Sequence, residues 1–82
     1  MAKKRMEWRV SPSYTMGLLA LILVGPSKQF AEEVYCVCSF QRRDVNSMLQ
    51  ATTRAATWTK EYRAKRWRVN DRQITLQAML DV

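Results

Sequence analysis

The longest apolar stretch of the chain runs from Met16 to Val24 and lies inside an uncharged segment, residues 10–27. This segment reaches the lower limit for crossing a bilayer as a helix, where about 17 to 25 residues are needed. Its strongly apolar part is short and stops at Gly25-Pro26, which is typical of a secretory signal. We therefore expect a signal or signal-anchor here, with a buried strand or helix of a folded domain as the alternative. The expected membrane segment comprises Met16, Leu18, Leu19, Leu21, Ile22, Leu23 and Val24.

Beyond residue 46 the apolar positions recur with a helical period. Ser47 and Gln50 have the spacing of a capping box, which predicts the start of a helix over about 47–68. Asn70 and Gln73 repeat that spacing and predict a second helix over about 71–81. One side of the first helix carries an apolar stripe, made of Ala51, Ala55, Trp58, Tyr62 and Val69.

Residues 34–40 are rich in β-branched and aromatic types and could form a short strand, while residues 30–33 could equally well form a helical turn, so the pattern leaves this stretch open. Taken together, the patterns predict a mainly α fold, with an N-terminal hydrophobic segment followed by two C-terminal helices. The chain divides into a basic leader with its signal or anchor segment, residues 1–31, and a small basic helical segment, residues 32–82.

The chain is strongly basic, with 14 Lys and Arg against 7 Asp and Glu, a net charge of +7 over 82 residues. Such an excess favours acidic partners such as nucleic acid, anionic lipid or an acidic protein face. Residues 1–31 hold five basic groups and one acidic group, a net of +4, while residues 32–82 hold nine and six, a net of +3. A basic, acid-poor leader agrees with a targeting segment.

Basic and aromatic residues alternate between positions 54 and 72, where they could neutralise phosphates and stack on bases, or settle at a lipid interface. A solvated cationic helix face is the plainer interpretation. The expected binding surface comprises Arg54, Trp58, Lys60, Tyr62, Arg63, Lys65, Arg66, Trp67, Arg68 and Arg72.

The stretch Arg42 to Leu49 resembles the start of the second helix in ribbon-helix-helix repressors, through Val45-Asn46-Ser47. In that family a short strand with alternating polar residues precedes the helices and contacts the DNA groove. The candidate strand at Leu19–Val24 departs from that pattern because it is wholly apolar.

The residues that usually carry catalysis are scarce. Histidine is absent, only two glycines occur, and Cys36 and Cys38 have no histidine to act as their base. Two thiolates cannot close a zinc site within one chain, so we expect no metal or other cofactor. We expect both cysteines to be small buried side chains, with pairing to another chain as the alternative.

The sequence favours a small non-enzymatic accessory protein, membrane-associated or exported, whose basic helical part binds a partner protein or an anionic membrane surface. The alternative is a cytoplasmic, dimeric, repressor-like protein that binds nucleic acid through residues 54–72. Association of identical chains is compatible with both.

Overall fold

A computed structural model describes residues 4–13, 17–27, 29 and 32–82. Of these, 38% lie in strands and 34% in helices, so the fold is α+β and the expected mainly α class is wrong. The elements in chain order are β1 (Arg5–Pro12), β2 (Leu18–Gly25), β3 (Glu33–Gln41), α1 (Val45–Ala64), β4 (Arg68–Asn70) and α2 (Leu76–Leu80).

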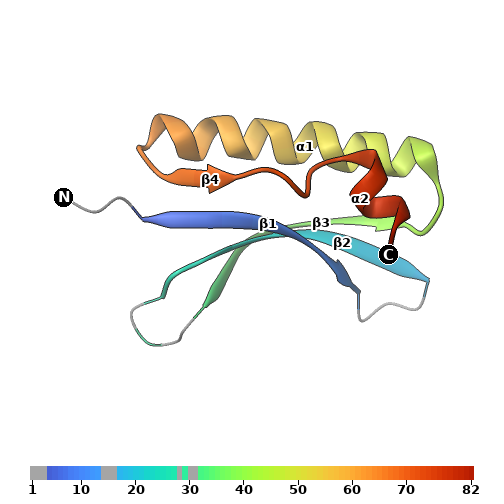
Figure 1. Cartoon of the computed structure of the whole chain (residues 1–82), viewed down its shortest axis with the longest axis horizontal. Coiled ribbons are helices and arrows are strands. Elements are labelled where there is room, and N and C mark those ends of the chain that lie inside the picture. The colour runs from blue at the N-terminus through green and yellow to red at the C-terminus, as the bar shows by residue number, and fades with distance from the viewer. Residues whose placement is uncertain (1–3, 14–16, 28, 30–31) are drawn as a thin grey trace.

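The four strands form one mixed sheet in the order β3-β2-β1-β4. β1, β2 and β3 form an antiparallel meander, and α1 carries the chain across so that β4 pairs parallel to β1. α1 lies over one face of the sheet, and α2 packs against α1 near the C-terminus (Figure 1). No helix of the described residues covers the opposite face. Strands from both sides of residue 31 therefore share a single sheet.

The apolar run that suggested a membrane segment is a buried central strand. Leu19, Leu21 and Leu23 of β2 are fully buried against the helices, and Ala20 and Val24 on the other face are only 5% exposed. β2 is flanked by β1 and β3, and only Leu18 and Ile22 are part-exposed, so apolar side chains are needed at nearly every position. The signal-anchor interpretation is therefore wrong for Leu18–Val24, while Met16 lies outside the described residues. Among the described helices, none is long and apolar enough to cross a membrane.

The strand that residues 34–40 could form is present as β3, and the helix expected over 47–68 has different ends. α1 begins at Val45 because Asp44 caps it, with the carboxylate accepting from the Ser47 backbone N–H at 3.2 Å. It ends at Ala64, four residues before the expected end, because Arg66 adopts a positive φ of 69°.

The C-terminal helix is also shorter than expected. Residues 68–70 pair with β1 as β4, while the Asn70 side chain accepts from the Arg72 backbone N–H in a local turn. α2 therefore begins only at Leu76, capped by the Thr75 hydroxyl, which accepts from the Ala78 backbone N–H at 3.1 Å. The side-chain oxygen at Asn70 thus stabilises a turn rather than the start of a helix.

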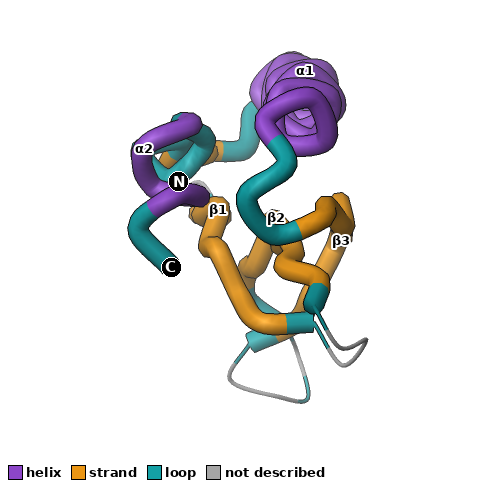
Figure 2. The backbone as a smooth tube through the Cα atoms, turned by 90° about the vertical axis from the view of Figure 1, so that its right-hand side faces the viewer, coloured by secondary structure: helices purple, strands orange, loops and turns teal. Residues whose placement is uncertain are grey.

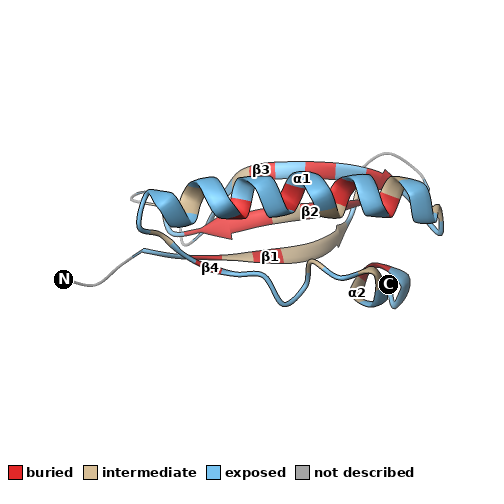
Figure 3. Ribbon diagram, turned by 90° about the horizontal axis from the view of Figure 1, so that it is seen from above, coloured by how far each residue is buried: buried red, intermediate tan, exposed pale blue. Residues whose placement is uncertain are grey.

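One core lies between the sheet and the helices, and the buried faces of β1, β2, β3 and α1 line it (Figure 3). Trp8 is 1% exposed, and its indole N–H donates to the Thr59 hydroxyl of α1 at 2.7 Å. Cys36 and Cys38 are unpaired and buried on the helix side of β3, as expected from the sequence. β1 and α1 are thus joined by a hydrogen bond as well as by apolar contact.

Candidate functional site

Four aromatic side chains meet near the C-terminal end of α1, and this end of the helix is on the left of Figure 1. Trp58 and Tyr62 are one helical turn apart on α1 and stack with ring centroids 6.1 Å apart. Trp67 meets Tyr62 edge to face at 6.1 Å and Tyr35 of β3 at 5.6 Å. These separations are within the range for favourable aromatic pairs. Trp58 is 39% exposed and the other three rings are half-buried.

The way α1 ends places Trp67 in this group. The backbone N–H of Trp67 donates to the Tyr62 carbonyl at 3.1 Å, and that of Arg66 donates to the Arg63 carbonyl at 3.0 Å. These two bonds, with the positive φ of Arg66, form a Schellman motif, in which the residue after the left-handed one contacts the last turn of the helix. The reversal of the chain thus sets one indole against Tyr62 and directs the next residues into β4.

Cations lie over two of the rings. The Lys4 ammonium is 5.3 Å from the centre of a Trp67 ring, and the Lys65 ammonium is 5.7 Å from the centre of the Tyr62 ring. Both distances fit cation–π contacts. The Arg68 backbone N–H donates to the Lys4 carbonyl at 3.0 Å, which fixes the start of β4 beside the start of β1. The strand pairing therefore holds Lys4 beside Trp67, whereas Lys65 and Tyr62 are both held by the end of α1.

Two further cations lie side by side on the uncovered face of the sheet. Arg5 and Arg68 are register partners in the parallel β1–β4 pair, and both are exposed. Neither takes part in an ion pair with another described residue. They line a cleft of about 600 Å³ together with Asn70 and the end of β2. Like charges in adjacent positions repel each other, so an anion beside these two guanidinium groups would be stabilised by both, whereas Glu7 and Glu32, which also line the cleft, would oppose it.

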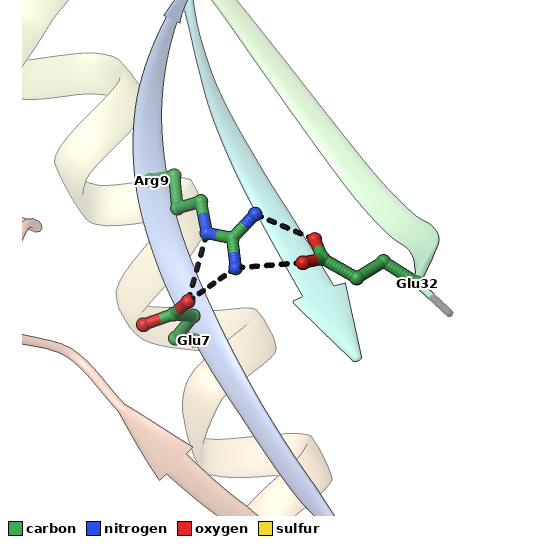
Figure 4. Close-up of polar contacts among 3 residues, drawn as sticks. All are labelled: Glu7, Arg9 and Glu32. Atoms are coloured by element: carbon green, nitrogen blue, oxygen red, sulfur yellow. Dashed lines mark hydrogen bonds and ion pairs between the residues drawn. The ribbon is translucent and has the colours of Figure 1, made fainter. Parts of the chain in front are cut away.

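Arg9 lines the same cleft, but its charge is already matched by two carboxylates, so that the three residues together carry one negative charge (Figure 4). Its Nε donates to Glu7 Oε1 at 2.8 Å, and its Nη1 donates to Glu32 Oε2 at 2.6 Å. These two carboxylates raise the pKa of Arg9 above its usual value, mainly through the hydrogen bond to Glu32. Arg9 therefore ties β1 to the segment before β3 and leaves Arg5 and Arg68 as the cations free to bind a ligand.

The structure brings together only part of the surface that the sequence indicated. We call the assembled surface the basic-aromatic end; it comprises Lys4, Arg5, Tyr35, Trp58, Tyr62, Lys65, Arg66, Trp67 and Arg68. Arg54 lies nearer the start of α1, in a groove beside β3. Lys60 lies on the other flank of α1, near Ile74. Arg63 donates to the Val69 carbonyl at 2.8 Å and pairs with Asp71 at 3.4 Å, and Arg72 follows β4.

Three members of the basic-aromatic end were not expected from the sequence. Lys4 and Arg5 belong to the stretch that was interpreted as a leader, and Tyr35 belongs to the strand before α1. Met6 and Trp8 alternate with the charged residues Arg5, Glu7 and Arg9, which is a weak sign of a strand with one buried and one exposed face. Nothing in the local pattern indicates that this strand lies beside residues more than sixty positions away.

The buried thiols are poorly suited to nucleophilic chemistry at neutral pH. Burial, with a smaller contribution from Cys38, raises the pKa of Cys36 to about 12, and the thiolate is the reactive form. Burial also raises the pKa of Tyr35. Within the described residues, no three His, Cys, Asp or Glu side chains gather as they would around a metal ion.

Comparison with known proteins gives no relative: no family model, curated protein or solved structure matches the chain. The function is therefore inferred from the geometry of the basic-aromatic end.

Proposed function

We propose that the protein binds single-stranded nucleic acid at its basic-aromatic end. The observation that carries this proposal is the contact of partly exposed aromatic rings with cations, namely Lys4 over Trp67 and Lys65 over Tyr62. Proteins that bind single strands without strong sequence preference combine these two features, because rings stack on bases and cations neutralise the backbone.

The rings favour a single strand over a duplex. Bases in a duplex are stacked on one another and do not offer their faces to Trp58, whereas the bases of a single strand are free to stack on it. Arg5 and Arg68 lie at the same end of β1 and β4 but face away from α1, because their neighbours Met6 and Val69 are buried on the helix side. A strand stacked on the rings would therefore meet these two guanidinium groups where its backbone passes over the end of the sheet.

An anionic membrane surface would attract the same cations, and it is the main competing partner. The sequence favoured membrane binding because it contained an apolar segment that was interpreted as an anchor. The described part of that segment, Leu18–Val24, lies in the central strand β2. With that segment buried, membrane binding would rest on Trp58 and the basic charges alone. Stacking, in contrast, uses the ring of Trp58, which is 39% exposed and is itself stacked on Tyr62.

Binding of a fluorescent 12-nucleotide single strand, followed by fluorescence anisotropy, tests the proposal. Neutralising three to five phosphates should give a slope of log K against log salt of about −2 to −3.5. Removing a stacked ring costs about 1 to 3 kcal/mol, so Trp58→Ala should raise Kd by ~5- to 150-fold. Trp58 is part-exposed on α1, so this change leaves the core in place.

A matched pair of lysines on α1 supplies the control. Lys65→Ala removes the cation over Tyr62 and should weaken binding and flatten the salt slope by about 0.7. Lys60→Ala removes the same charge from the opposite flank of the helix and should leave the slope nearly unchanged. Equal effects of the two changes would mean that net charge alone drives binding. Binding to anionic phosphatidylglycerol vesicles with none to the oligonucleotide would contradict the proposal.

A further inference from the structure

One edge of the sheet is a long strand with nothing beyond it. β3 spans nine residues and forms the edge on the right of Figure 2, whereas β4 at the other edge has only three residues. Its outer backbone groups face away from β2, the only strand with which it pairs among the described residues. Soluble proteins usually protect such an edge with lysine, proline or a covering element, because it is a template for another strand. β3 contains no lysine, arginine or proline, and the one irregularity in its pairing with β2 is a β-bulge near its start, at residues 34–36.

The side chains along this edge are unusually apolar for an exposed position. Val34 and Val37 are 51% and 56% exposed on the uncovered face of the sheet. They lie opposite Val24 and Ile22 of β2, so an apolar band on this face reaches the edge and stops there. Another strand alongside β3 would continue the band and remove both valines from water.

The charges around β3 favour a second copy of the chain as the occupant. Two carboxylates lie at its start, Glu33 and Glu32, of which Glu32 also pairs with Arg9 of its own chain; two guanidinium groups, Arg42 and Arg43, follow its end, and residues 34–41 are uncharged. In an antiparallel pair centred on Val37, residue 32 of one copy meets residue 42 of the other, and residue 33 meets residue 41. The acidic end of each strand would therefore lie beside the basic end of its neighbour, twice by symmetry.

The surroundings of β3 leave room for this strand. A groove of about 810 Å³ separates its edge from α1 and is lined by residues of both elements, among them Cys38, Phe40, Ala51 and Arg54. Backbone pairing places a neighbouring strand about 4.8 Å from β3. A second β3 would lie in the plane of the sheet, beside this groove.

We propose that the protein forms a twofold-symmetric homodimer in which the β3 strands of two copies pair antiparallel about Val37 and join the two sheets into one of eight strands. The four-stranded sheet of each copy is unchanged in this arrangement. The proposal rests on the edge of β3 and does not depend on nucleic-acid binding.

Light scattering coupled to gel filtration should give about 19 kDa for the protein at ~100 µM, twice the 9.6 kDa of one chain. Val37→Lys places two ammonium groups together at the twofold axis and should give the monomer mass with an unchanged circular dichroism spectrum. Leu80→Lys, an apolar-to-lysine change at a similarly exposed position in α2, should leave the dimer intact. A monomer mass for the unaltered protein up to ~1 mM, a range that detects even weak dimers, would overturn the proposal.

Cross-linking checks the register. In a Cys36→Ala/Cys38→Ala background, Val37→Cys should give a disulfide-linked dimer under mild oxidation, because facing Cβ atoms lie about 5 Å apart. Val34→Cys should not, because the two copies of residue 34 would be about 20 Å apart along the strands. Cross-linking through residue 34 and not through residue 37 would overturn the register.

Oligonucleotide binding by the monomeric Val37→Lys variant would separate this proposal from the proposed function, because all residues of the basic-aromatic end are kept.

Discussion

A single hydrogen bond in the core shows how one residue can join the sheet to the helix. The Thr59 hydroxyl is 4% exposed, accepts from the Trp8 indole N–H at 2.7 Å and donates to the Ala55 carbonyl at 2.8 Å. Thr59→Val keeps the shape but leaves the buried N–H without an acceptor, which should lower the free energy of unfolding by about 1 to 3 kcal/mol. Urea denaturation followed by tryptophan fluorescence measures this change in the free energy of unfolding.

Thr57 offers the matched control for this change. Its hydroxyl makes a similar bond to the carbonyl four residues earlier, at 3.2 Å, but it is exposed and has no indole partner. Thr57→Val should change the free energy of unfolding by less than about 0.5 kcal/mol. Equal urea midpoints for the two variants would show that the indole bond contributes nothing.

At the scale of single residues, the sequence predicts which side chains are buried better than it predicts which residues contact each other. The cysteines are buried as expected, because a free thiol behaves as a small apolar group. The site residues Lys4 and Arg5 could not be paired with Trp67 and Arg68 from the sequence, because no short-range pattern records the β1–β4 pairing.

At the scale of the elements, the end of α1 sets both the fold and the candidate site. Arg66 occupies the left-handed position of the Schellman motif, where glycine avoids a steric cost that other residues carry. Arg66→Gly should therefore raise the free energy of unfolding by about 0.5 to 1 kcal/mol. Lys65→Gly, one residue earlier at a φ of −86°, should lower it by a similar amount because it only adds freedom to the unfolded chain. A urea midpoint that falls in both variants would contradict the assigned role of Arg66.

The helix α1 was predictable from its apolar period, but its end was not. No glycine or proline stands at residues 64–68, so the pattern predicted helix through Arg68. Tertiary contacts ended it instead, since Val69 is buried in β4 beside Met6 of β1. A strand of three residues is too short to give a period of its own, so β4 was predicted as the joint between two helices.

At the scale of the whole molecule, the apolar run at Leu18–Val24 was interpreted as a signal or membrane segment, whereas its surroundings are the core of the protein. A run of this length satisfies a signal sequence and a central strand equally well, and composition does not choose between them. The flanking charges favoured a signal because they were treated as a leader. In the folded chain that leader includes β1, whose Trp8 and Met6 cover the same core as β2. The distinction depended on pairing between strands, which a single sequence does not record.

The central place of β2 predicts that this one strand carries much of the stability of the molecule. An 82-residue domain is typically stable by about 4 to 12 kcal/mol, and Leu21→Ala at a fully buried position should remove about 2 to 5 kcal/mol of that. Ile22→Ala, on the part-exposed opposite face of the same strand, should cost clearly less. Urea midpoints at one fixed protein concentration compare the two, because dimerisation would make stability depend on concentration. If the two midpoints coincide, β2 is not the centre of a packed core and the arrangement of the whole sheet is wrong.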